Sequence, residues 1–282
     1  MRSVKKLAFI FLVTSLVGFS QAPPGATGGP PGGRGGSGRG GRGGSGRGGF
    51  GNQFAGQKRI KALIISGGCC HDYPGQDKIL MDLMGNQLPV DWTVIYEGGT
   101  AGDVKVQLYD KPNWAAGFDL VIHNDCYAQV TDAKLIGQIV AAHKAGVPSM
   151  VFHCSLHTYR DATVDDWREF MGVESHRHTM AHNIAVKVNG TPSFITRGMP
   201  AEWSTPTDEL YVIVKTWPSM TPLATAMSPE ADHNVYPVIW TNDYNGTRVF
   251  GTSLGHAETW NDPVFRDMVI RAFKWTVKRD LP

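Results

Sequence analysis

Short apolar runs and amphipathic segments alternate along the chain from about residue 58 onward. The apolar runs are rich in β-branched and aromatic side chains, which indicates buried strands. In the segments between them, apolar residues recur with a period near 3.6, which predicts helices. This order is typical of a doubly wound sheet with helices on both faces. We predict strands over residues 61–66, 92–96, 118–122 and 147–152, and helices over residues 76–86, 132–145 and 167–171.

The pattern changes after residue 180. Apolar runs now follow one another without long helical segments between them, and the chain closes on an amphipathic stretch. We therefore predict one α/β domain with a doubly wound, mostly parallel sheet of the flavodoxin-like type. The elements expected here are strands over residues 184–188, 210–215, 235–240 and 248–253, and a helix over residues 263–278.

The first 57 residues show neither pattern. Residues 1–22 carry three positive charges, then thirteen almost wholly apolar residues, then small residues, which predicts a secretory signal peptide. A retained membrane anchor is the alternative, but thirteen apolar residues fall short of the roughly 20 that span a bilayer. Residues 23–57 are dominated by Gly and Arg, so we expect a disordered linker before the folded domain of residues 58–282. We therefore expect a secreted or periplasmic protein that has no membrane span after cleavage.

The linker changes the interpretation of the charge balance. Its spaced Arg34, Arg39, Arg42 and Arg47 are similar to RGG segments of RNA-binding proteins, but the export signal favours a flexible cationic tether near an anionic cell surface. Residues 1–56 hold seven of the 27 basic residues and no acidic residue, so the remainder has 20 basic against 25 acidic residues. A mildly acidic domain without a basic run gives no electrostatic basis for nucleic-acid binding.

Ionisable side chains gather where the predicted strands end. Ligands of doubly wound sheets bind beyond the carboxyl ends of the strands, so these residues are expected on one rim. Three further histidines, at positions 176, 178 and 182, follow the short helix and could fold back toward it. The rim candidates are His71, Asp72, His123, Asn124, Asp125, His153, Cys154, His157, His256, Glu258 and Trp260.

Several segments carry a resemblance to a known family. They are GGCCHDYPGQ (67–76), FHCSLHTYRDATVDDWREFMGVESHRHT (152–179), DELY (208–211), PVIWTNDYNGTRVFGTSLGH (237–256) and W-x-D-P-x-F (260–265). On these segments the chain resembles the ThuA-like (trehalose-utilisation) family over residues 58–280. The resemblance implies a fold like that of class I glutamine amidotransferases and a role in the use of trehalose or related sugars. It also implies a sugar dehydrogenase as a partner in the same pathway.

The cysteines suggest a rival chemistry. Class I glutamine amidotransferases use a cysteine nucleophile on a tight turn after a strand, within G-x-C-x-G. Cys154 follows a predicted strand, but the flanking glycines are absent, so we expect a structural thiol. The adjacent Cys69 and Cys70 do not bridge easily without strain, and the four cysteines match no zinc motif. Most of them, including Cys126, are therefore expected to be buried thiols.

The histidines suggest acid–base chemistry, with or without a metal. Imidazole can move protons near neutral pH, which suits reaction at the carbon beside a ketone, and it also binds zinc. His71 or His256 is the expected base, oriented by Asp72, Glu209 or Glu258. The catalytic candidates are His71, Asp72, His153 and His256, and the candidate ligands of a zinc ion are His153, His157, His178 and His256.

Aromatic and polar residues near the same rim suggest a carbohydrate ligand. Sugar rings present C–H faces that stack on aromatic rings, although aromatic residues also fill cores. The candidates for substrate binding are Tyr73, Asn124, Glu209, Tyr211, Glu258 and Trp260. Two functions stay open: an enzyme that acts on a trehalose-like disaccharide or a 3-keto-glycoside, as isomerase, lyase or hydrolase, and a sugar-binding or cell-surface module without catalysis.

Overall fold

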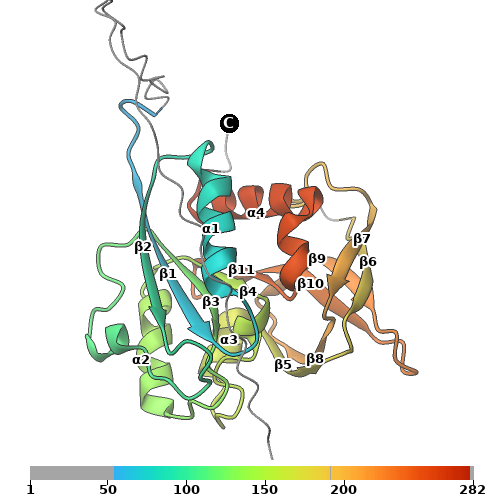
Figure 1. The fold of residues 1–282 in the computed structure, drawn as a ribbon, viewed down its shortest axis with the longest axis horizontal. Helices are drawn as coiled ribbons and strands as arrows, with labels where there is room; N and C mark the ends of the chain where they lie inside the picture. Colours follow the sequence, from blue (N-terminus) through green and yellow to red (C-terminus); the bar gives the residue numbers. More distant parts are fainter. Residues whose placement is uncertain (1–53, 191, 280–282) are drawn as a thin grey trace, which may run out of the picture. The chain divides into compact units, whose positions relative to one another are not determined.

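The computed structural model describes residues 54–190 and 192–279 (Figure 1). The predicted signal peptide, residues 1–22, and most of the predicted linker, residues 23–57, lie outside the described residues. Within the described part of the chain, no helix is both long enough and apolar enough to cross a membrane.

A nine-stranded sheet runs through the described residues. Five neighbouring strands are parallel, and four antiparallel strands extend the sheet on one side. The parallel part is, in order, β2 (Val90–Glu97), β1 (Ile60–Gly68), β3 (Leu120–Cys126), β4 (Ser149–Phe152) and β11 (Thr247–Thr252). The extension is β10 (Val235–Tyr244), β9 (Met220–Met227), β6 (His182–Val188) and β7 (Glu202–Asp208).

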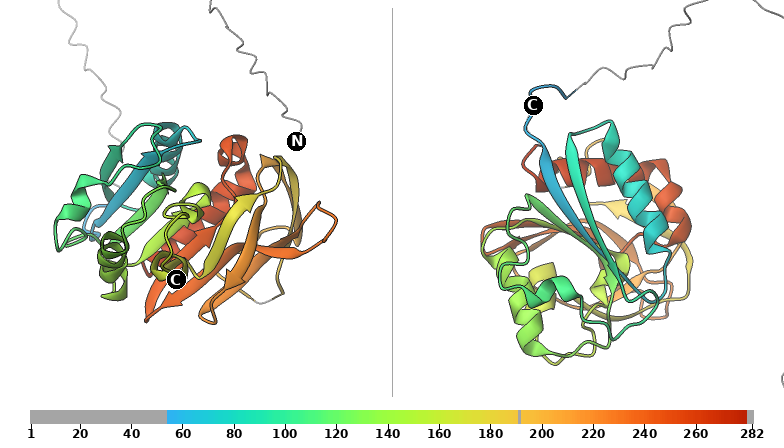
Figure 2. Two further views of the ribbon diagram at one scale, coloured as in Figure 1. Left: turned by 90° about the horizontal axis from the view of Figure 1, so that it is seen from below. Right: turned by 60° about the vertical axis from the view of Figure 1, so that its left-hand side comes forward.

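Helices cover both faces of the sheet, as expected. The views of Figures 1 and 2 agree that α1 (Tyr73–Gly85) and α4 (Pro263–Thr276) lie on one face. The opposite face is covered by α2 (Ala133–Lys144) and α3 (Asp166–Met171). Each pair of helices buries its apolar side in a separate core cluster, so the sheet is apolar on both faces.

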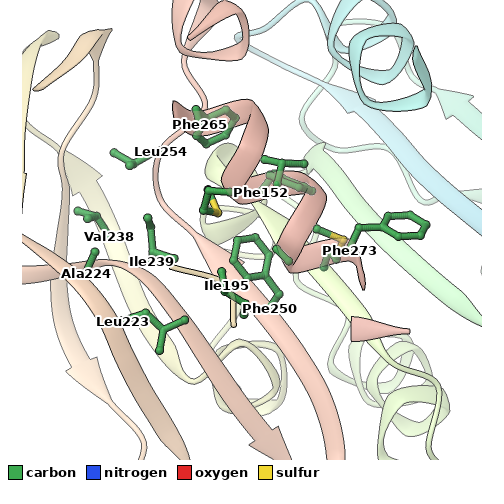
Figure 3. Close-up of a cluster of buried hydrophobic side chains, with 14 of the residues drawn as sticks. Phe152, Ile195, Leu223, Ala224, Val238, Ile239, Phe250, Leu254, Phe265 and Phe273 are labelled. Carbon is green, nitrogen blue, oxygen red and sulfur yellow. The ribbon is translucent and has the colours of Figure 1, made fainter. Parts of the chain in front are cut away.

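Figure 3 shows part of the core on the α4 side. Phe152 of β4 and Phe250 of β11 pack there with their ring centroids 6.0 Å apart, and Phe265 and Phe273 of α4 lie in the same cluster. All four rings are fully buried. This packing fixes the ends of β4 and β11 next to each other, which matters because the chain leaves both strands toward the same rim.

Local sequence signals place the helices. Asp72 caps α1 by accepting a hydrogen bond from the backbone N–H of Gly75 at 3.1 Å. Asp262 caps α4 in the same way, and Pro263 occupies the first helical position. At the end of α3, Gly172 takes a left-handed φ of 84°, a conformation that favours glycine.

Some sequence predictions are wrong in detail. The strand predicted over 118–122 is shifted, because β3 runs through Cys126 and therefore contains His123, Asn124 and Asp125. Three strands were not predicted: β7, β9 and β5 (Val173–His178), which pairs with β8 (Tyr211–Thr216) in a separate two-stranded sheet.

The expectation for the adjacent cysteines is also wrong. Cys69 and Cys70 are bonded to each other through their sulfur atoms. Cys70 accommodates the bridge with a left-handed φ of 88°, which is rare for a residue other than glycine. Cys126 and Cys154 are free, buried thiols, as expected.

Candidate functional site

Four side chains meet at the carboxyl edge of the parallel strands. His71 follows β1, His153 follows β4, His256 follows β11, and Glu209 comes directly after β7. One nitrogen of each histidine and one carboxylate oxygen all lie within 4.8 Å of one another. We call these four residues the His–Glu cluster. It lies at the edge where doubly wound sheets bind their ligands.

A strained turn presents the ring of His153. The residue begins the 3₁₀ helix η2 (His153–Leu156) with φ at 41°, in the left-handed region. Gly255 makes room for it: a Cβ atom at position 255 would lie 3.2 Å from the Cβ atom of His153. Such strain is characteristic of functional sites, where the surrounding structure holds it in place. The elbow after β4 is thus occupied by a histidine, and Cys154 comes one residue later; both residues are buried.

The carboxylate of Glu209 is shared among several imidazoles. Its Oε2 lies 3.4 Å from Nε2 of His153, 3.6 Å from Nδ1 of His256 and 3.6 Å from Nε2 of His178. These distances are longer than those of ordinary hydrogen bonds, so the attraction is mainly electrostatic. The ring of His71 stands edge-on to those of His153 and His256, at centroid distances of 4.8 and 5.2 Å. The four side chains therefore form one compact group.

Three imidazole nitrogens of the cluster have no hydrogen-bond partner among the described residues, although they are buried. They are Nε2 of His71, Nε2 of His153 and Nδ1 of His256. Nδ1 of His153 donates to the carbonyl oxygen of Ser253 at 2.6 Å, so in the neutral ring Nε2 is the nitrogen with a free lone pair. Buried polar atoms are nearly always paired, so three unpaired nitrogens beside one carboxylate indicate a site for a ligand.

Asp208 holds the segments that carry the cluster. Its fully buried carboxylate accepts hydrogen bonds from the backbone N–H groups of Glu209 at 2.7 Å, Gly255 at 3.0 Å and His256 at 3.2 Å. Oδ1 also lies 3.8 Å from Nδ1 of His153. This residue was not among the candidates from the sequence. The resemblance covered it through the DELY segment, but nothing in the sequence shows that it reaches the loop after β11.

The charges of the cluster shift its pKa values. Burial acts to lower the pKa of His153, but the Glu209 carboxylate and the charge of Asp208 outweigh it and raise the pKa to about 9. Burial acts to raise the pKa of Glu209, but the neighbouring His153 and His178 outweigh it and lower the pKa to about 2. Burial lowers the pKa of His256, and the opposing Glu209 charge offsets this only in part. At neutral pH, charged His153 and Glu209 therefore lie beside a neutral His256.

The donor set fits a zinc ion. Catalytic zinc sites take three protein ligands, drawn from imidazole nitrogens and carboxylate oxygens, and keep one position open. His71, His153 and Glu209 would supply such a set, and the Ser253 carbonyl would orient His153 as the outer partners of metal-bound histidines do. His256 has a more exposed side chain, at 27%, than His153 at 3% and Glu209 at 16%, so of these three it is the most open to solvent.

A comparison with models of known protein families shows which family this chain is related to. A family model described as trehalose utilisation, ThuA, matches residues 100–276. The chain belongs to the ThuA family. Membership links it to carbohydrate metabolism, as the sequence resemblance implied. No curated protein matches the chain.

Solved structures agree with ThuA membership. A ThuA-like protein from Parabacteroides merdae shares 17% identity at a TM-score of 0.60, over 79% of this chain and 91% of that one. Another, from Bacteroides uniformis, shares 15% identity at a TM-score of 0.60, over 77% of this chain and 91% of that one. A β-galactosidase from Rahnella sp. R3 shares 16% identity at a TM-score of 0.50, over 79% of this chain but 32% of that one. These likenesses show the fold alone, and they confirm the expected single-domain α/β class with a doubly wound, mostly parallel sheet.

Two of the histidines expected as zinc ligands in this ThuA domain lie outside the cluster. His157 was expected to share a helix face with His153, but η2 is a 3₁₀ helix with three residues per turn, so residues four apart point in different directions. Its Nε2 lies 3.2 Å from Oγ of Ser175, and its ring stacks on Tyr211 at 4.4 Å. His178, on β5, reaches the rim of the cluster through its contact with Glu209.

Two carboxylates expected to orient the base have other positions. Asp72 is exposed and caps α1, and Glu258 is exposed in the 3₁₀ helix η3 (Ala257–Asn261). Of the three carboxylates considered, Glu209 is the one that the structure places beside His256, at 3.6 Å. The structure thus places one of the three carboxylates next to a candidate base, and its role in orienting that base stays a prediction.

The remaining candidates for substrate binding are largely buried. Tyr73 and Trp260 are each 1% exposed, and Tyr211 is fully buried. The indole of Trp260 packs on Phe152 with centroids 5.2 Å apart. Asn124 is also buried and donates a hydrogen bond to Asp77 at 3.0 Å. A role for these residues in substrate binding stays a prediction, and packing accounts for their positions.

Proposed function

We propose that this ThuA-family chain acts on trehalose-like disaccharides or 3-keto-glycosides by histidine acid–base chemistry, assisted by a zinc ion held in the His–Glu cluster. One observation carries the proposal: three buried imidazole nitrogens, without hydrogen-bond partners in the described part of the chain, face a single carboxylate at the carboxyl edge of the parallel strands. Family membership supplies the substrate class, and the cluster supplies the chemistry.

The residues divide into a holding group and a reacting group. His71, His153 and Glu209 would hold the ion, which when bound would polarise a carbonyl or hydroxyl oxygen of the sugar. His256 is neutral at pH 7 because burial lowers its pKa, so its imidazole can accept a proton. The carboxylate of Glu209, 3.6 Å from Nδ1 of His256, stabilises the imidazolium that forms.

A keto-sugar substrate suits this arrangement best. The hydrogen on a carbon beside a ketone is acidic enough for a histidine to remove once the ketone oxygen is polarised. Isomerisation or elimination of a 3-keto-glycoside begins with that step. A sugar dehydrogenase that oxidises the disaccharide is the class of enzyme that would supply the substrate.

The test follows the sugar by proton NMR in deuterated water. Zinc-loaded full chain is incubated with trehalose and with its 3-keto derivative, and we expect loss of the proton signal beside the ketone, followed by product signals. The His256→Ala variant should lose the exchange, and His182→Ala, a histidine outside the cluster, should keep it. If zinc-loaded wild type leaves every sugar unchanged, the catalytic proposal fails and a sugar-binding module without catalysis becomes the better description.

A further inference from the structure

Another hollow lies at the opposite edge of the sheet from the His–Glu cluster. Its walls come from the amino ends of β1, β3, β4 and β11 and from the end of α4, and its volume is about 320 Å³. Small-ligand sites usually have volumes of about 300–1,000 Å³, so this hollow can take a small group. We call it the basic hollow, after five of its lining residues: Lys58, Arg59, Arg248, Lys278 and Arg279.

Positive charge is concentrated at the basic hollow. Residues 57–282 hold 20 basic and 25 acidic residues, yet the hollow is lined by five basic residues and one acidic residue, Asp119. Oδ1 of Asp119 lies 3.6 Å from Nζ of Lys58. Lys278 and Arg279 are exposed, and neither forms an ion pair within the described part of the chain. A local excess of positive charge in a concave site attracts anions.

The other two basic residues have structural partners. Nε of Arg59 donates a hydrogen bond to Oδ1 of Asp91 at 2.6 Å. The guanidinium of Arg248 donates to the carbonyl oxygen of Trp275 at the end of α4 and lies 4.9 Å from the centroid of the indole ring. An anion in the hollow would therefore be bound mainly by the remaining three basic residues.

A second, polar hollow of about 460 Å³ adjoins the basic one. The two have four lining residues in common: Gly246, Thr247, Arg248 and Lys278. Together they form one groove at the turn between β10 and β11. The polar hollow has three hydroxyl side chains in its wall: Ser219, Thr221 and Thr241. Thr221 and Thr241 are directly opposite each other on β9 and β10, so their side chains share one face of the sheet.

We propose that this groove binds an acidic polysaccharide, with an anionic group of the polymer in the basic hollow and neighbouring sugar hydroxyls in the polar hollow. Lysine and arginine bind carboxylate and sulfate groups through charge-assisted hydrogen bonds. The hydroxyl groups of serine and threonine can both donate to and accept from sugar hydroxyls. The site goes beyond the proposed function, because it would hold the domain on a polymer while the His–Glu cluster acts at the opposite edge.

The shape of the groove favours a polysaccharide over other anionic polymers. The headgroups of a membrane lie in a surface and attract basic groups that project toward it, whereas these line a hollow. Single-stranded nucleic acid stacks its bases on aromatic rings. The aromatic ring that lines this groove, that of Trp275, already has the Arg248 guanidinium over it.

Calorimetric titration of the full chain with polygalacturonate at low salt tests the charge of the basic hollow. The double variant Lys278→Gln/Arg279→Gln should bind about fivefold more weakly. Its slope of log Kd against log salt should be shallower by about one, because fewer counterions are released. The matched control, Lys134→Gln/Lys187→Gln, removes two exposed lysines elsewhere and the same net charge, and it should bind like wild type.

The polar hollow is tested with Thr221→Val/Thr241→Val, which keeps the shape of both side chains. This variant should bind polygalacturonate about fivefold more weakly with an unchanged salt slope. Neutral dextran should not bind to wild type. The proposal is overturned if polygalacturonate does not bind, or if Lys278→Gln/Arg279→Gln binds no more weakly than its control, as expected if the linker arginines alone attract the polymer. It is also overturned if phosphatidylserine vesicles or oligothymidylate bind as tightly and lose as much in that variant.

Discussion

Replacing Glu209 by Gln removes the charge that faces His153 and keeps the shape of the side chain. The raised pKa of His153 means that the folded protein stabilises its charged form. A pKa of about 9 in the folded state against 6.5 in the unfolded state corresponds to about 2.5 kcal/mol of stability at pH 7. Asp208 still faces the ring at 3.8 Å, so we expect Glu209→Gln to cost about 2 kcal/mol at pH 7 in the metal-free protein.

The direction of the pKa shift sets how this loss of stability depends on pH. Because the pKa of His153 is raised in the folded state, its contribution is full below pH 6.5 and is lost as the pH rises through about 9. Wild type and Glu209→Gln are unfolded in urea across pH 6 to 10 with a chelator present. The difference between their free energies of unfolding should shrink toward high pH. Glu258→Gln, an exposed glutamate near the same rim, serves as the matched control and should change nothing measurable. A loss of unfolding free energy that does not depend on pH, or an equal loss in the control, would refute the ion pair between Glu209 and His153.

Three further expectations concern the same corner of the domain. Asp208→Asn removes one of the two carboxylate oxygens that accept hydrogen bonds from the N–H groups of Glu209, Gly255 and His256. We expect this change to lower the free energy of unfolding, measured in urea, by about 3 kcal/mol. An unchanged urea midpoint would contradict this. Gly255→Ala places a Cβ atom 3.2 Å from that of His153 at a φ of 138°, and should reduce both Tm and zinc affinity. Zinc must displace the proton of His153, so competition with a fluorescent chelator should show affinity rising about tenfold per pH unit from pH 6.5 to about 9.

The parallel half of the sheet could be predicted because its strands are buried on both faces. Their apolar runs stand out against the helical segments, as in β1, where eight of nine residues are buried. The unpredicted strands lack such runs. β7 alternates exposed residues with buried ones such as Trp203 and Thr205, and β5 is half exposed in its two-stranded sheet. Period-2 alternation in β7 was the available signal, and Pro206 obscured it.

The site could be predicted in part. His71, His153 and His256 follow strands of the parallel sheet, so the topology alone places them on one rim. The position of Glu209 depends on the path of the antiparallel extension, which the sequence did not show. His157 was included on an assumed α-helical turn, and the actual 3₁₀ turn points it elsewhere.

Zinc binding by the full chain tests the central claim most directly. Calorimetric titration of the metal-free protein should show one ion per chain, with affinity at least about tenfold weaker in His71→Ala. His256→Ala should keep the ion while losing proton exchange on the keto-sugar, and His182→Ala should match wild type in both. Absence of binding, or equal loss in His71→Ala and His182→Ala, would contradict a metal-assisted site built on the His–Glu cluster.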